Sequence, residues 1–379
     1  MSEYQYYHFR AIDRSLTPKE MRHLRDISSR ADITPVSFVN EYNWGDLQAD
    51  PRDLMGDFFD VHVYLSNWGT AVFMLRLPKE VFDTQTLNSF SVEPYFEIEA
   101  LADYWLLTWS LGESGEDERF EEHDGGSWMT RLAPLREELL RGDLRSLYIG
   151  WLRAVSEDDI EAEREPMALA GLGDLTAAQQ ALAEFLAIDP DLLAGVGASC
   201  RAKCGEEDAA ARDAWLDKLP PDEVRGYLHQ MLTGQGAQAE RALRRSFADW
   251  RAKATAESGT AMCRTVEELW QLADQAQKVR LAREASARKK AEAAERKRRE
   301  VWLTKLAENF SKSWRIAGKE AARGCAGAYD SVCLLLVDLR DAYNLQGNLD
   351  IFQSEFEKFM AEHTRRKALV TRLEKIGLR

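Results

Sequence analysis

The chain has 379 residues, of which 45% are hydrophobic, 30% charged and 10% aromatic, a composition typical of a folded protein that excludes wholesale disorder. This length corresponds to about two to three domains of ~100–200 residues. No stretch approaches the ~18 apolar residues of a membrane span, and the first thirty residues contain no apolar signal core. We therefore expect a cytoplasmic protein with no membrane contact.

Charge divides the chain into two halves. The net charge is -14, but residues 1–200 hold 37 acidic and 16 basic side chains, whereas residues 201–379 hold 27 acidic and 34 basic ones. The acidic front half repels nucleic acid, while the basic back half can bind it or bind an acidic partner. An odd number of cysteines indicates free thiols in a reducing compartment. They are Cys200, Cys204, Cys263, Cys325 and Cys333.

The first 112 residues have the pattern of a mixed α/β head. Residues 4–12 are aromatic-rich and extended, and Thr17-Pro18-Lys19-Glu20 has the sequence of a capped helix start. β-rich runs then come in pairs joined by turn residues. These runs are residues 60–66 with 70–77 and 95–101 with 103–110.

An acidic loop and a helical domain follow the head. Residues 113–127 are rich in Asp, Glu and Gly and predict a loop, and residues 128–255 predict a helical domain. Its first helix covers residues 128–155 with an interruption near Gly142. Shorter amphipathic helices are expected over residues 176–188, 189–199, 207–217, 221–234 and 236–252.

A long charged helix of the coiled-coil type is predicted over residues 262–320, because no proline follows Pro221 and Thr265 begins a capping box. Residues 282–300 contain only alanine, serine and charged side chains, so they predict a solvated rigid spacer about 28 Å long. A C-terminal helical hairpin is expected over residues 325–379, with helices at 327–344, 350–364 and 366–377. The expected stabilising pairs are Glu284/Arg288, Glu292/Arg296 and Glu295/Arg299.

The predicted fold class is therefore α+β: a mixed N-terminal α/β head followed by a mainly α-helical region with the spacer helix and the hairpin. Phrases across residues 4–144 resemble an uncharacterised family of bacterial proteins with no established activity. The tail is similar to the end of that family and, more loosely, to closing segments of SWIM zinc finger proteins. The phrases are Tyr4-Gln5-Tyr6-Tyr7, Ala11-Ile12-Asp13-Arg14, Ile33-Thr34-Pro35, Phe38-Val39-Asn40, Trp44-Gly45-Asp46, Asn67-Trp68-Gly69, Met74-Leu75-Arg76-Leu77-Pro78 and Arg141-Gly142-Asp143-Leu144, with Val337-Asp338-Leu339-Arg340-Asp341 in the tail.

Metal binding has two weak candidates. Cys200 and Cys204 lie one helical turn apart, but no ligand signature supplies the third and fourth ligands that zinc requires. The acidic run of residues 121–124 offers oxygen and imidazole donors, yet no apolar anchors order it. We expect no metal and no cofactor.

Catalysis also has only weak candidates. His8 and His62 lie on predicted strands and become general bases only beside a carboxylate. Glu97 and Glu99, with Asp57 or Asp60, form a faint nuclease-like set of carboxylates. Structural histidines and an exposed charged strand explain these residues equally well, so we expect no catalytic residue.

Two tryptophans are the candidate binding residues of the head. Trp44 and Trp68 each stand beside a glycine at the end of an extended run. A turn covered by an aromatic ring is one interpretation, and a platform for a peptide or ligand is the other, because tryptophan supplies much contact area at small entropic cost.

The spacer helix carries the other candidate binding residues. Ten bases against four acids between residues 278 and 300 predict either a solvated face, a nucleic-acid contact or an acidic protein partner. The two basic clusters are Arg288, Lys289 and Lys290, and Arg296, Lys297, Arg298 and Arg299.

These patterns favour a non-enzymatic interaction or scaffold protein that serves a bacterial cytoplasmic complex and has a protein partner. The first alternative is a nucleic-acid-associated regulator, or an accessory subunit of a stress or defence locus, that uses the basic helix. The second alternative is a metal-dependent hydrolase in the head.

Overall fold

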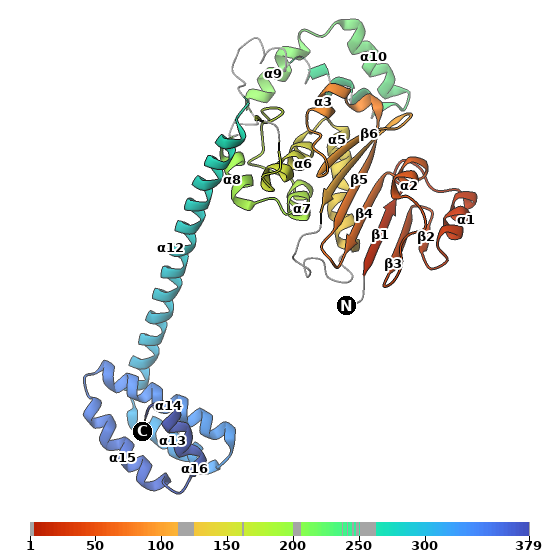
Figure 1. Cartoon of the computed structure of the whole chain (residues 1–379). Coiled ribbons are helices and arrows are strands. Elements are labelled where there is room, and N and C mark those ends of the chain that lie inside the picture. Colours follow the sequence, from red (N-terminus) through yellow and green to blue (C-terminus); the bar gives the residue numbers. More distant parts are fainter. Residues whose placement is uncertain are drawn as a thin grey trace. The chain divides into compact units, whose positions relative to one another are not determined.

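The computed structural model describes residues 4–112, 125–160, 163–199, 206–250 (apart from 237, 241, 245, 248 and 249) and 263–378. It divides into two compact units, residues 1–279 (unit 1) and residues 280–379 (unit 2). Unit 1 contains an antiparallel sheet with helices, and the C-terminal part is mainly helical (Figure 1), which confirms the predicted α+β class. The predicted domain boundaries stay a prediction.

Unit 1 is built around a seven-stranded sheet in the order β2-β3-β1-β4-β5-β7-β6, in which every neighbouring pair is antiparallel. The paired runs predicted from the sequence form β4 with β5 and β6 with β7, whereas β2 and β3 were missed. The strands are β1 (Gln5–Arg10), β2 (Asp32–Thr34), β3 (Ser37–Tyr42), β4 (Val61–Ser66), β5 (Ala71–Pro78), β6 (Phe96–Ala100) and β7 (Tyr104–Leu111).

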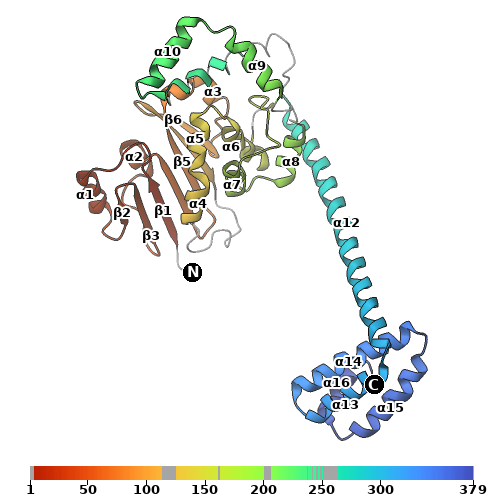
Figure 2. The same cartoon turned by 180° about the vertical axis from the view of Figure 1, so that it is seen from behind.

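Side chains alternate between the two faces of the sheet, as the twofold period of a strand requires. On one face, Phe9 and Phe38 join the core beneath α1 (Pro18–Ile27) and α2 (Pro51–Asp57). The other face, which includes Val63 and Trp109, packs against the helices after residue 125. Figure 2 shows α4 and α5 lying against this second face.

The first helical layer departs from the single interrupted helix predicted for residues 128–155. Three helices replace it: α4 (Gly125–Leu132), α5 (Pro134–Leu140) and α6 (Arg145–Ser156). Pro134 begins α5, and Gly142, with φ +83, allows the turn before α6. The helix α4 begins at Gly125, so the last three residues of the predicted loop 113–127 are helical, and residues 113–124 lie outside the described part.

Four of the later helices of unit 1 follow the sequence prediction closely: α7 (Ala177–Phe185), α8 (Pro190–Ser199), α9 (Glu206–Leu216) and α10 (Pro221–Leu232). The short helices α2 and α3 (Thr84–Asn88) were not predicted. The helix predicted over 236–252 lies partly outside the described residues. The helix α12 (Val266–Ala307) begins in unit 1, where Leu269 and Ala273 join the core.

A buried ion pair holds the start of α12 in unit 1. Glu165, whose side chain is fully buried, accepts hydrogen bonds from the guanidinium and the backbone N–H of Arg264, and from the Tyr148 hydroxyl at 2.7 Å. Gly195 of α8 lies so close to α12 that a Cβ there would be 2.5 Å from the backbone of Leu272. The long helix therefore starts from a fixed position within this core.

Unit 2 contains the rest of α12 and the helices α13 (Phe310–Arg323), α14 (Ala326–Leu345), α15 (Leu349–His363) and α16 (Lys367–Lys375). Phe310 stacks on Tyr343 at 3.7 Å, and Trp314 packs between Phe352 and Phe359. The predicted helix 262–320 is wrong at its end. Asn309 caps a new helix by accepting a hydrogen bond from the Lys312 amide, so the helix is divided at residues 308–309.

None of the helices in the described parts of the chain combines the length and the apolar composition that a membrane span requires.

Candidate functional site

The two candidate tryptophans are brought to the same end of the sheet by the strand order. The strand β1 lies between β3 and β4, and its first residue, Gln5, is paired with Tyr42 on one side and Ser66 on the other. Trp44 follows Tyr42 by two residues, and Trp68 follows Ser66 by two. Because neighbouring strands are ~4.8 Å apart, the two turns leave the sheet about 10 Å from each other. We call this region, residues 43–46 and 67–69, the tryptophan end.

Both turns are fastened to the start of β1. The Gln5 amide donates to the Gly45 carbonyl at 3.1 Å and to the Asp46 carboxylate at 2.7 Å. On the other side, Asn67 accepts from the Tyr4 amide through its side chain and donates its own amide to the Tyr4 carbonyl, both at 3.0 Å. Gly45 and Gly69 have φ values of +85 and +87, a conformation that glycine adopts without strain.

Two tyrosines, the buried Tyr7 and the half-buried Tyr64, hold the side chain of Gln5. The hydroxyls of Tyr7 and Tyr64 donate to the Gln5 side-chain oxygen at 2.8 and 2.9 Å. Burial raises the pKa of Tyr64 to about 12 and that of Tyr7 further, so both hydroxyls stay protonated and remain donors. The tyrosines therefore fix Gln5, and Gln5 fixes the turn that carries Trp44.

The tryptophans differ in exposure. The Trp44 side chain is 70% exposed, whereas Trp68 is half-buried. The exposed acidic residues Glu41 and Asp46 flank Trp44 in the sequence and leave the turn negatively charged. A large rigid ring in an acidic setting suits an apolar or cationic side chain of a partner.

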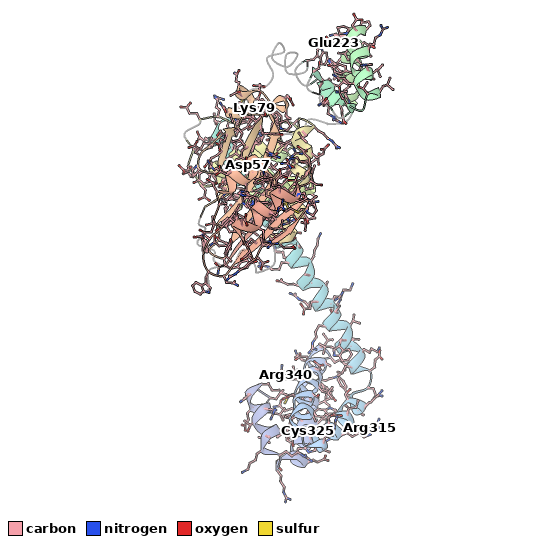
Figure 3. All side chains as sticks on the ribbon, turned by 90° about the vertical axis from the view of Figure 1, so that its right-hand side faces the viewer. Asp57, Lys79, Glu223, Arg315, Cys325 and Arg340 are labelled. Carbon is pink, nitrogen blue, oxygen red and sulfur yellow. The ribbon has the colours of Figure 1, made fainter. Side chains whose placement is uncertain are left out.

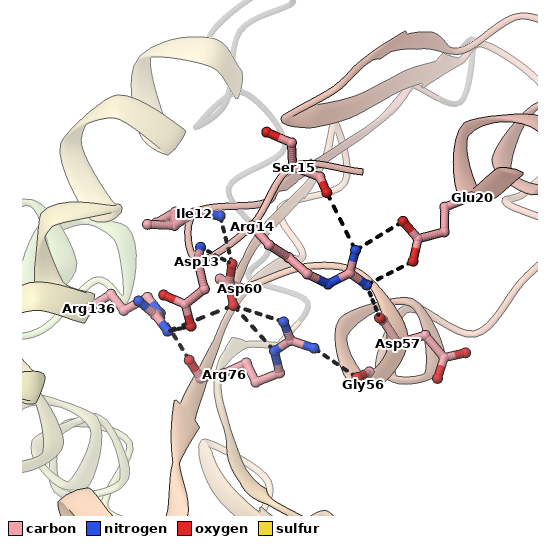
Figure 4. A network of polar contacts seen from close by, with 10 residues as sticks. All are labelled: Ile12, Asp13, Arg14, Ser15, Glu20, Gly56, Asp57, Asp60, Arg76 and Arg136. Carbon is pink, nitrogen blue, oxygen red and sulfur yellow. Dashed lines mark hydrogen bonds and ion pairs between the residues drawn. The ribbon is translucent and has the colours of Figure 1, made fainter. Parts of the chain in front are cut away.

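The carboxylates of the nuclease-like set do not form one site, because each is bound to different partners. Asp60 is fully buried: its carboxylate accepts from the amides of Ile12 at 2.6 Å and Asp13 at 2.9 Å, and from Arg76 at 2.9 Å (Figure 4). Arg136 lies 3.7 Å from the same carboxylate and donates to Asp13 at 2.7 Å. The site is a closed ionic network with its oxygens occupied.

The charge of Asp60 follows from these donors. Burial opposes ionisation, but the two backbone amides and the guanidinium groups of Arg136 and Arg76 outweigh it and hold the pKa of the carboxyl below its usual range. This network joins the residue before β4 to β5, α5 and the turn after β1, so it fixes the sheet to its helical layer.

The other carboxylates of that set lie on the surface. Glu97 and Glu99 of β6 pair with Arg52 of α2, at 2.5 and 3.7 Å. The backbone carbonyl of Asp57 accepts from Arg14 at 3.2 Å. Within the described residues no group of three or more His, Cys, Asp or Glu side chains is placed to hold a metal ion.

The two strand histidines are packed rather than paired with carboxylates. His62 is fully buried, stacks on Phe9 at 3.9 Å and hydrogen-bonds through Nδ1 to the His8 carbonyl at 3.1 Å. Burial lowers the pKa of His62 to about 3, and burial with the charge of Arg10 lowers that of His8 to about 4. Both are neutral structural histidines at pH 7.

The basic residues of α12 are exposed, as predicted for a solvated stretch. Every residue from 277 to 302 has an exposed side chain. The ion pairs differ from those predicted, because Glu284 pairs with Arg280 and Glu292 with Arg288. The candidate residues in this stretch are Arg288, Lys289, Lys290, Arg296, Lys297, Arg298 and Arg299.

Arg299 differs from the rest of this set. Its guanidinium pairs with Asp338 at 2.5 Å and Asp341 at 3.1 Å, both on α14. The side chain therefore attaches α12 to the helices of unit 2, and the expected Glu295/Arg299 pair is replaced. This role could not be predicted from the sequence, because the partners are about forty residues away.

An exposed apolar row on α10 was missed from the sequence. Val224, Leu228, Met231 and Leu232 lie along one side of the helix and are between 37% and 87% exposed. Their spacing of four, seven and eight residues was the available signal, but it only predicted an amphipathic helix. Cys200, Cys204 and residues 121–124 lie outside the described part of the chain.

Comparisons with family models, curated proteins and solved structures gave no match for this chain. The resemblance to an uncharacterised bacterial family, and that of the tail to SWIM zinc finger proteins, therefore stay predictions.

Proposed function

We propose that the protein is a non-enzymatic interaction protein of the bacterial cytoplasm that binds a protein partner at the tryptophan end of unit 1. The observation that carries this proposal is Trp44, which is 70% exposed on a turn held by Gln5 and the tyrosines beneath it. Tryptophan on a preorganised turn is the residue type most enriched at the energetic centre of protein interfaces.

Charge specifies the class of partner. Unit 1 has 50 acidic and 28 basic side chains, a net charge of -22, and Glu41 and Asp46 lie within three residues of Trp44 in the sequence. A partner surface with Lys or Arg next to apolar groups matches this turn, because a cation packs on the indole face while acidic neighbours attract it. We propose a basic protein partner.

A cytoplasmic location is supported by the cysteines. Cys263, Cys325 and Cys333, which belong to the described residues, are free thiols, as a reducing compartment permits.

The experiment is a quantitative purification of complexes from the native host, with wild-type protein, Trp44→Ala and Leu232→Ala. Leu232 is 87% exposed on α10 of the same unit, so its variant removes a comparably exposed apolar side chain elsewhere. We expect a protein with a basic surface to be enriched by the wild type and by Leu232→Ala, and to be lost from Trp44→Ala.

The purified partner then gives the affinity by calorimetry. Removal of an interface tryptophan is expected to weaken binding by at least about 2 kcal/mol, or roughly thirtyfold. Trp44→Ala should keep the melting temperature of the wild type, because its ring is exposed. Binding that is unchanged by Trp44→Ala would reject the tryptophan end as the interface.

A further inference from the structure

One face of α12 within unit 2 is occupied by the helices it packs against. Arg299 pairs with Asp338 and Asp341 of α14, and the Trp302 indole N–H donates to Asp338 at 3.2 Å. Leu303, one residue later, is buried. These contacts define which side of the helix is turned toward the rest of unit 2.

The opposite face of α12 carries a regular basic row. Arg283, Lys290 and Lys297 follow each other at intervals of seven residues, so at ~100° per residue they stay within about 40° of one another around the helix. The same geometry places them about half a turn away from Arg299 and Leu303. All three side chains are exposed, and side chains project along this part of α12 in Figure 3.

Acidic side chains do not interrupt this row. The four acids of residues 280–300 fall at other angles around the helix: Glu284, Glu292, Glu295 and Glu300. At 1.5 Å per residue the bases are about 10.5 Å apart and the row is about 21 Å long. Unit 2 as a whole has 22 basic and 14 acidic side chains, a net charge of +8. The row is thus a continuous positive strip.

The composition of the strip limits what it can bind. Residues 282–300 contain no Leu, Ile, Val, Met or aromatic side chain, so this stretch of α12 has neither the apolar seam of a coiled coil nor the apolar face of a membrane-surface helix. Protein interfaces depend on apolar or aromatic anchors, which the strip lacks. Binding to a phosphate backbone requires only spaced Lys and Arg.

We propose that Arg283, Lys290 and Lys297 form a phosphate-binding row through which unit 2 binds nucleic acid without sequence preference. Each base contacts one phosphate and releases its condensed counterion. Base recognition is not expected, because the strip offers no aromatic ring for stacking. Arg299 does not take part, since two carboxylates already hold its guanidinium.

The test uses the full-length protein and fluorescence anisotropy with two labelled 20-base-pair DNA duplexes of unrelated sequence, between 25 and 200 mM salt. The row variant is Arg283→Gln, Lys290→Gln and Lys297→Gln. The matched control is Lys358→Gln, Lys367→Gln and Lys375→Gln, which removes the same charge from exposed positions on α15 and α16. Circular dichroism verifies that both variants are folded.

We expect the wild type to bind both duplexes equally, with an affinity that falls as salt rises. The row variant should lose at least about tenfold in affinity at 50 mM salt, and its log–log salt slope should be smaller by about 2–3, since three phosphate contacts are lost. The control variant should keep most of the affinity and the slope.

Four results would overturn the proposal: no binding at 25 mM salt, equal loss in the row and control variants, more than tenfold preference between the duplexes, or binding of poly-glutamate as tight as that of DNA. The last result would identify an acidic polypeptide as the ligand. Trp44→Ala should bind DNA as the wild type does, so this proposal and the proposed function fail separately.

Discussion

The two units of this chain use charge in opposite ways. In unit 1, with a net charge of -22, Asp60 and Arg76 are buried and bonded to each other, and buried Glu165 is bonded to Arg264. In unit 2, with a net charge of +8, the described core is made of apolar and aromatic side chains with His363, and the ion pairs lie at its surface. Buried charge fixes one architecture, whereas exposed charge remains able to bind a ligand.

Removing one carboxylate from each unit is expected to give the largest difference in stability loss between the two units. Asp60→Asn leaves Arg76 and Arg136 without their buried counter-charge and should destabilise unit 1 by about 3–5 kcal/mol. Asp338→Asn leaves Arg299 with Asp341 at a partly exposed site and should change stability by less than about 1 kcal/mol. Urea unfolding of both variants measures this, and equal losses would contradict the assigned roles.

Replacing one glycine by alanine in each unit should change stability in opposite directions. Gly195→Ala inserts a methyl group against the backbone of Leu272 and should destabilise unit 1 by about 1–3 kcal/mol. Gly318→Ala, in α13 with no atom near its would-be Cβ, should stabilise unit 2 by up to about 1 kcal/mol through helix propensity. Thermal unfolding distinguishes them, and a stabilising Gly195→Ala would mean that α8 and α12 are not in close contact.

Acid should weaken unit 1 through His62. The folded pKa of about 3 lies below the unfolded value near 6.5, so the unfolded chain binds the extra proton. Stability from this group is fully present above about pH 6.5 and is lost as the pH falls toward 3. The slope of the unfolding free energy against pH measures how many more protons the unfolded chain binds than the folded one. His62→Gln should lower this number by about one in that range.

His363 of unit 2 is the matched control for this pH dependence. Burial and the charge of Arg366 also lower its pKa, but it lies on a small helical unit rather than inside a sheet. We expect a smaller change of slope in His363→Gln. A wild-type curve that stays flat between pH 7 and pH 4 would contradict a buried neutral His62.

The smallest effect concerns the exposed part of α12. A peptide of residues 278–301 should be partly helical at low salt, because alanine favours helix and the Arg280/Glu284 and Arg288/Glu292 pairs add about 0.2–0.5 kcal/mol each. Helicity measured by circular dichroism should fall slightly as salt screens the pairs. A random-coil spectrum at low salt would show that α12 depends on the packing at its ends.

Local features of the sequence predicted much of the fold. The capping box of Thr17 and Glu20 starts α1 as expected, and alternation with turn residues located β4, β5, β6 and β7. The strand β2 was missed because it has only three residues, and β3 because its six residues include the polar Asn40 and Glu41. In both strands the alternation of apolar and polar residues is too weak to indicate a strand. The end of α12 was also missed, because nothing in the sequence distinguishes Asn309, whose side chain caps α13, from other polar residues of the helix.

The candidate sites show the same limit. Trp44 and Trp68 were chosen from the sequence as separate turns, and the strand order then placed both beside Gln5. The basic clusters were also chosen from the sequence. The sequence did not predict that Arg299 binds α14, whereas Arg283, Lys290 and Lys297 lie on the other side of the helix. Asp60 was taken for a possible catalytic carboxylate and is instead held by two arginines.

The sequence by itself determined the charge asymmetry, the exposed alanine-rich stretch and most helices and strands, because these depend on side chains within a few residues of each other. Only the tertiary structure decided which distant groups meet. Gln5 reaches Asp46 across 41 residues, and Arg136 reaches Asp13 across 123. Such partners are set by strand order and helix packing, which no local period encodes, and they determine which charges are neutralised inside and which remain exposed to a ligand.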